Sequence, residues 1–82
     1  MSMKRKIELY GRLRDAGLGR AVSVDLPKSA TARQALSALN TVFGKKSDLL
    51  RGCVLATGDE ILSSSDELPS GPLAVLPPVY GG

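Results

Sequence analysis

The chain has 82 residues, 43% of them hydrophobic, with eleven basic and eight acidic side chains and a formal net charge of +3 at pH 7. This composition is ordinary for one globular domain and argues against disorder over most of the length. Aromatic residues make up only 4% of the chain, which disfavours a nucleic-acid site built on stacked bases. The single cysteine, Cys53, excludes an internal disulfide and favours a reducing compartment.

The charge is unevenly distributed along the chain. Residues 1–51 hold all eleven bases and four acids, which gives +7, whereas residues 52–82 hold four acids and no base, which gives −4. Without aromatic residues beside the bases, a solvated face or a docking surface for an acidic partner is a better interpretation than nucleic-acid binding. The N-terminus lacks the apolar segment of a signal peptide, and the runs "CVLA" and "LAVL" are too short to span a bilayer. We therefore expect a cytoplasmic protein that binds neither nucleic acid nor membrane.

The first elements in chain order read as a hairpin. In residues 4–13, Ile7, Leu9 and Leu13 follow the alternation of a strand, and Gly17 and Gly19 then supply a turn. Residues 21–26 alternate again between apolar and polar side chains, and Pro27 ends this second strand.

The period then changes to that of a helix over residues 31–43. Its apolar residues recur at intervals of three and four positions, namely Ala32, Ala35, Leu36, Leu39, Val42 and Phe43. Thr31 with Gln34 three residues later predicts a capping box, and Gly44 predicts a left-handed stop.

The remainder predicts short elements. Residues 45–51 suit a short turn of helix, and residues 53–62 suit a strand, a turn at Gly58-Asp59 and a short strand at Ile61-Leu62. Residues 63–72 read as a loop, and the apolar run 73–76 suits a central strand. The predicted order is β-β-α-β-β-β, an α+β domain over residues 1–76 with one mixed sheet under one long helix, followed by a flexible tail over residues 77–82.

The usual catalytic and metal-binding side chains are missing from the sequence. There is no histidine, and Cys53 has no second ligand at metal-site spacing and lies in an apolar strand, where we expect a buried thiol. Nothing near Ser63, Ser64 and Ser65 could activate a hydroxyl, and "GLG" lacks the spacing of a dinucleotide motif. We therefore predict no bound cofactor and no metal site.

The reactive group that remains is the α-carboxylate of Gly82. ATP could convert it to an acyl-adenylate, which a sulfur nucleophile would turn into a thiocarboxylate and an amine would turn into an isopeptide. Gly81 and Gly82 have no Cβ, so they suit a narrow partner site, and Pro77-Pro78 favour an extended path toward it. Val79 and Tyr80 would be anchors along the channel wall.

These features resemble the ubiquitin-like sulfur carriers, and in particular the small subunit of molybdopterin synthase. The tail over residues 77–82, "PPVYGG", matches the Pro-Pro-Val-x-Gly-Gly ending of that family, with Tyr80 in the variable position. The opening "LYGRLRDAGLG" is similar to the family's first strand and following turn, through Leu9, Leu13, Arg14 and Gly17.

The resemblance implies a β-grasp fold in which the first and last strands pair in parallel at the sheet centre. It implies that a ubiquitin-activating-like adenylyltransferase adenylates Gly82 with ATP, and that magnesium and zinc belong to that enzyme. The resulting thiocarboxylate would donate sulfur to a dithiolene precursor inside the large subunit of molybdopterin synthase, with residues 79–82 entering both partners.

Three alternatives remain open. The sulfur could go to thiamine or another sulfur-containing metabolite, or Gly82 could be conjugated to lysines as a protein modifier. The chain could also be a simple binding module, for example for RNA through Arg12 and Arg14.

Overall fold

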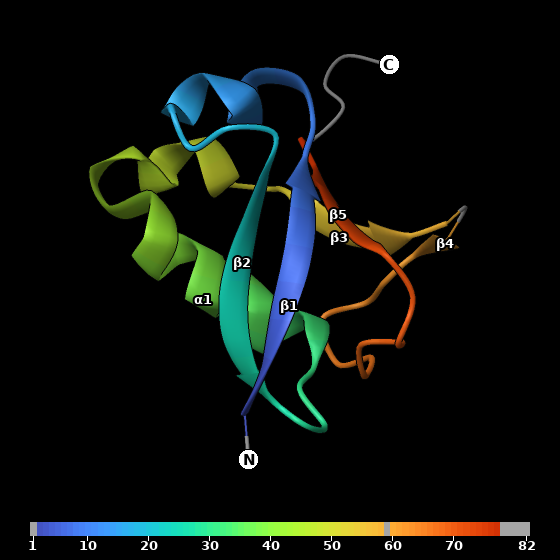
Figure 1. Ribbon diagram of the computed structural model, residues 1–82. Coiled ribbons are helices and arrows are strands. Elements are labelled where there is room, and N and C mark those ends of the chain that lie inside the picture. The colour runs from blue at the N-terminus through green and yellow to red at the C-terminus, as the bar shows by residue number, and fades with distance from the viewer. Residues whose placement is uncertain (1, 59, 78–82) are drawn as a thin grey trace.

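The protein is described by a computed structural model, which places residues 2–58 and 60–77. The five strands form one sheet in the order β2-β1-β5-β3-β4, and the long helix α1 packs across one face of it (Figure 1). The strands are β1 Ser2–Leu9, β2 Ala21–Pro27, β3 Val54–Thr57, β4 Glu60–Ile61 and β5 Leu73–Leu76. The helices are α1 Ala32–Phe43 and two 3-10 helices, η1 Gly11–Ala16 and η2 Gly44–Leu50.

The sheet has the mixed topology that the resemblance implied. β1 pairs antiparallel with β2 and parallel with β5, so the first and last strands lie side by side in the middle of the sheet. β5 pairs antiparallel with β3 on its other side, and β3 pairs antiparallel with the short β4 at the sheet edge. The predicted element order and the predicted α+β class are confirmed.

The core lies between α1 and one face of the sheet. Alternate strand residues point into it, including Ile7 and Leu9 of β1 and Leu73 and Val75 of β5. The helix contributes a buried stripe of Ala32, Ala35, Leu39 and Phe43. Because each fully buried aliphatic side chain contributes about 1.5–3 kcal/mol, this aliphatic core accounts for much of the stability of so small a domain. The predicted apolar face of the helix included Val42, but this residue is 38% exposed and does not belong to the buried stripe.

The N-terminus of α1 has the predicted capping box. Thr31 Oγ1 accepts from the backbone N–H of Gln34 at 3.4 Å, and Gln34 Oε1 accepts from the backbone N–H of Thr31 at 2.9 Å. The next two N–H groups, of Ala32 and Arg33, donate to the carbonyls of Asp66 and Ser64, each at 2.9 Å. The loop before β5 is therefore fixed to the start of the helix.

The first strand ends earlier than its pattern predicts. A strand through residue 13 is wrong, because β1 stops at Leu9 and Gly11, at φ +60°, turns the chain into η1. Leu13 is nevertheless 0% exposed, since η1 returns its side chain to the core. Leu9 in the strand and Leu13 in the 3-10 helix are therefore both buried, although the backbone conformation changes between them.

Three smaller boundaries also differ from expectation. Gly44 ends α1 with the predicted positive φ, but its φ of +55° and ψ of −119° lie outside the left-handed helical region. The helical turn expected at residues 45–51 is the 3-10 helix η2. The fourth strand is Glu60–Ile61, and Leu62 follows it with its N–H donating to the carbonyl of Leu55 at 2.8 Å.

Within residues 2–58 and 60–77, no helix has the length and apolar character needed to cross a bilayer.

Candidate site at the tail exit and the open sheet face

The tail predicted to be functional begins at the end of the central strand. Pro77 directly follows β5 and is half-buried. The other predicted tail residues, Pro78, Val79, Tyr80, Gly81 and Gly82, lie outside the described residues, so their role stays a prediction. What the structure provides is the surroundings of Pro77, which we call the tail exit.

Gly11 packs directly against Pro77 at the tail exit. A Cβ built at Gly11 would lie 3.0 Å from Pro77 Cγ and 3.6 Å from Pro77 Cδ, and the residue has a φ of +60°. Glycine therefore serves two purposes here, since its φ is positive and its missing side chain leaves room for the proline ring. The sequence pattern did not single out Gly11, although it interrupts the alternation of the first strand.

The end of β1 beside the tail exit is fixed by Arg14. Its Nε donates to the carbonyl of Leu9 at 2.9 Å, and its Cζ lies 5.6 Å from the centre of the Tyr10 ring, a cation–π contact. Leu9 is also the residue that pairs with Val75 of β5. Arg14 thus stabilises the strand end beside the tail exit.

Cys53 lies just before β3 and is a buried residue, as predicted. The side chain is 7% exposed, and its Sγ donates to the carbonyl of Leu49 at 3.3 Å. Burial raises the pKa of this thiol, while the positive charge of Arg12 acts in the opposite direction. The thiol is therefore protonated at neutral pH, which suits a core residue and not a nucleophile.

The predicted serine loop is a turn. The backbone N–H of Ser63 donates to Asp66 Oδ2 at 2.9 Å, and the N–H of Asp66 donates to the carbonyl of Ser63 at 3.0 Å.

In the part of the chain that the structure describes, no cluster of three or more His, Cys, Asp or Glu side chains could hold a metal ion.

The face of the sheet opposite α1, which we call the open face, is largely apolar next to the tail exit. The pairing register aligns Glu8, Ala74 and Ala56 across three strands, Leu76 with Val54, and Ala56 with Ile61. Paired residues point to the same side of a sheet, so these side chains share one surface. Ile61 is 67% exposed and Tyr10 is 41% exposed, which leaves substantial apolar area uncovered.

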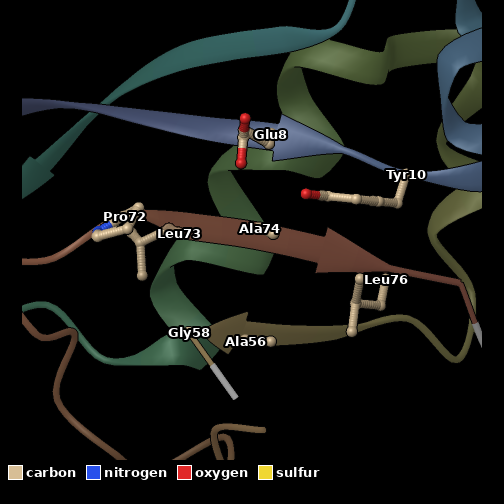
Figure 2. A pocket seen from close by; sticks show the side chains of 8 residues that line it. All are labelled: Glu8, Tyr10, Ala56, Gly58, Pro72, Leu73, Ala74 and Leu76. Atoms are coloured by element: carbon tan, nitrogen blue, oxygen red, sulfur yellow. The ribbon is translucent and has the colours of Figure 1, made fainter. Parts of the chain in front are cut away.

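A groove crosses the open face and encloses about 360 Å³. Figure 2 shows its lining with α1 behind the sheet, and the alanine side chains of β3 and β5 form the low part of the surface. The lining residues are Glu8, Tyr10, Ala56, Gly58, Pro72, Leu73, Ala74 and Leu76. The sequence alone did not reveal this groove, because it depends on which strands are neighbours.

The architecture of one helix on a five-stranded mixed sheet with a parallel central pair is the β-grasp fold of ubiquitin-like proteins. Among solved structures, the chain is similar to SAMP1 from Haloferax volcanii, with 26% identity, 98% of this chain and 100% of that chain covered, and a TM-score of 0.71. A crystal structure of H. volcanii small archaeal modifier protein 1 matches with 25% identity, coverage of 93% and 98%, and a TM-score of 0.70.

A putative molybdopterin converting factor, subunit 1, from Pyrococcus furiosus matches at the level of fold, with 22% identity, coverage of 95% and 100%, and a TM-score of 0.67. No protein-family model and no curated protein matches the chain. The resemblance to ubiquitin-like proteins of this kind, first recognised in the tail, is confirmed by these neighbours.

Proposed function

We propose that this chain is a ubiquitin-like carrier that acts through the carboxylate of Gly82, most specifically as a sulfur donor for molybdopterin. The observation that carries the proposal is the likeness over nearly the whole chain to a small archaeal modifier and to a molybdopterin converting factor subunit. The "PPVYGG" tail, attached at the end of the central strand, supports it.

The chemistry is completed by partners. An oxygen of the Gly82 carboxylate attacks the α-phosphorus of ATP in a ubiquitin-activating-like adenylyltransferase, and pyrophosphate leaves. A sulfur donor then displaces AMP from the acyl-adenylate and leaves a thiocarboxylate. Its sulfur attacks the precursor held by the large subunit of molybdopterin synthase, and water then cleaves the acyl–sulfur bond, which leaves the sulfur on the precursor and restores the Gly82 carboxylate.

The part of this chain is to present its end at a distance from the folded body. Six residues in extended polyproline-like conformation would span about 18 Å at roughly 3.1 Å per residue, so a tail over residues 77–82 is long enough to reach a partner site. Pro77 and Pro78 keep the tail from folding back, Val79 and Tyr80 contact the channel wall, and Gly81 and Gly82 pass the narrowest part. The open face beside the tail exit would dock the partner that receives the tail.

A second candidate function is protein modification, in which a lysine amine of a target displaces AMP and forms an isopeptide with Gly82. The likeness to the small archaeal modifier favours it. Delivery of sulfur to thiamine or another metabolite would use the same thiocarboxylate.

Intact mass spectrometry tests the proposal. The chain is incubated with the adenylyltransferase of its own organism, ATP and a sulfur donor, and we expect one oxygen to be replaced by sulfur at Gly82. A variant without Gly81 and Gly82 should remain unmodified while keeping the same melting temperature, because the tail adds little to the core. An unmodified full-length chain under these conditions would contradict the proposal, and Gly-Gly remnants on lysines of other proteins would support the modifier function.

A further inference from the structure

The groove on the open face has the charged side chain of Glu8 among otherwise neutral described lining residues. Glu8 lies opposite Ala74 in the register of β1 and β5, and Ala74 lies opposite Ala56 of β3. Among the described residues that line the groove, Glu8 is the single charged one (Figure 2). Its carboxylate is therefore a charge that a group entering the groove would meet.

Glu8 has no partner among residues 2–58 and 60–77. It is exposed and forms no ion pair or side-chain hydrogen bond in the part of the chain that the structure describes. Lys6, two residues earlier on the same face, borders a neighbouring hollow together with Glu8 but forms no ion pair with it. The carboxylate is thus available to a group from outside.

Tyr10 adds a second acceptor beside this carboxylate. In Figure 2 the Tyr10 side chain extends from its Cα back along β1 toward Glu8, so its hydroxyl end faces the same part of the groove. A carboxylate and a hydroxyl oxygen suit the N–H donors of a cation. A phosphate or a nucleotide would be repelled by Glu8, and about 360 Å³ is at the low end of small-molecule pockets.

Covering this face with a partner creates a specific requirement. Leu76 in the lining, its strand partner Val54 and the exposed Ile61 opposite Ala56 add apolar surface, which favours burial against another protein. A carboxylate buried in such an interface loses hydration, and a partner charge of opposite sign that pairs with it offsets this loss. A docking protein that presents a cation at this position is therefore favoured.

We infer that the groove receives an arginine or lysine side chain of the adenylyltransferase that activates Gly82. The charged end pairs with Glu8 and the Tyr10 hydroxyl, and the methylene stem lies over Ala56, Ala74 and Leu76. The inference rests on the proposed function and adds the chemistry that selects the partner. The adenylyltransferase is the occupant because adenylation is the one step that sulfur donation and protein modification both require.

The test measures adenylation kinetics with the recombinant adenylyltransferase of the same organism. Pyrophosphate exchange into ATP is followed as a function of the concentration of the full-length chain, giving a KM for the chain and a kcat. We expect Glu8→Gln to raise this KM about tenfold or more, with kcat within about twofold of the wild-type value, because the lost ion pair acts in docking. Glu8→Lys should raise it further.

Asp25→Asn is the matched control. Asp25 is an exposed carboxylate on the same face, opposite Lys4 in the register of β1 and β2, far along the strand from the tail exit. The Asp25→Asn variant should have a KM within about twofold of the wild-type value. Reversing the charge of the enzyme's pairing arginine or lysine to glutamate should restore adenylation of the Glu8→Lys variant.

Failure of the Glu8 inference and failure of the proposed function give different results in this experiment. If the wild-type chain supports exchange and Glu8→Gln has the same KM, the inference is overturned while the proposed function stands, even if the variant binds another protein less well. If the wild-type chain supports no exchange at all, the proposed function fails and the inference falls with it.

Discussion

Replacing Gly11 by alanine tests how the tail exit is built. The backbone at position 11 has a φ of +60°, a conformation that costs about 1–2 kcal/mol for a residue with a Cβ. It also lies 3.0 Å from Pro77 Cγ, so the proline ring must move by a few tenths of an ångström. A ring has no rotamer by which to escape, so the displacement passes into the backbone at the start of the tail.

Gly19→Ala separates the two effects. Gly19 has a φ of +92°, and a Cβ there meets no atom within 4 Å, so this variant carries backbone strain without the contact. Overpacking typically costs about 1–3 kcal/mol, and Pro77 is only half-buried, so we take the lower value of about 1 kcal/mol for the difference between the two variants. For a domain of this size that corresponds to a melting temperature about 4–8 °C lower for Gly11→Ala than for Gly19→Ala.

The assay combines thermal unfolding by circular dichroism with adenylation of the tail. Gly11→Ala should lose severalfold in kcat/KM relative to Gly19→Ala, because small misplacement of a reacting group lowers the rate steeply. Equal melting temperatures and equal kcat/KM for the two variants would refute the idea that Gly11 positions Pro77.

Two further predictions concern the folded body. Leu39→Ala, at a side chain that is 0% exposed, should lower the free energy of unfolding by about 2–5 kcal/mol in urea titration, whereas Val42→Ala on the exposed side of the same helix should change it by no more than about 0.5 kcal/mol. Iodoacetamide should alkylate Cys53 more slowly than free cysteine in the same buffer, because burial raises its pKa and lowers the thiolate fraction. This difference should shrink in denaturant, and a folded chain that reacts as fast as free cysteine would contradict the burial of the thiol.

The helix was the element most accessible to prediction, because its signals are local. The capping pair Thr31 and Gln34, the stripe through Leu39 and the glycine at position 44 all lie within one short stretch. The 3-10 helix η1 was missed for the opposite reason. Leu13 has the right parity for a strand that continues from Leu9, and only the positive φ of Gly11 shows that the chain has turned.

In the candidate site, too, the local features were predictable and the long-range ones were not. Strand alternation predicts that Glu8 points away from Ile7 and Leu9, but not that Ala74 and Ala56 lie beside it. That neighbourhood depends on pairing between segments far apart in the sequence. The parallel central pair was predicted from the family resemblance, and Gly81 and Gly82 from the tail motif, whose function stays a prediction.

The central position of β5 has a consequence for biosynthesis. A ribosome delivers the β1–β2 hairpin and α1 first, yet the strand that joins them to β3 is made near the end of the described chain. The sheet therefore cannot close until Leu76 has emerged, and a nascent chain that stops earlier leaves two strand edges open to aggregation or proteolysis.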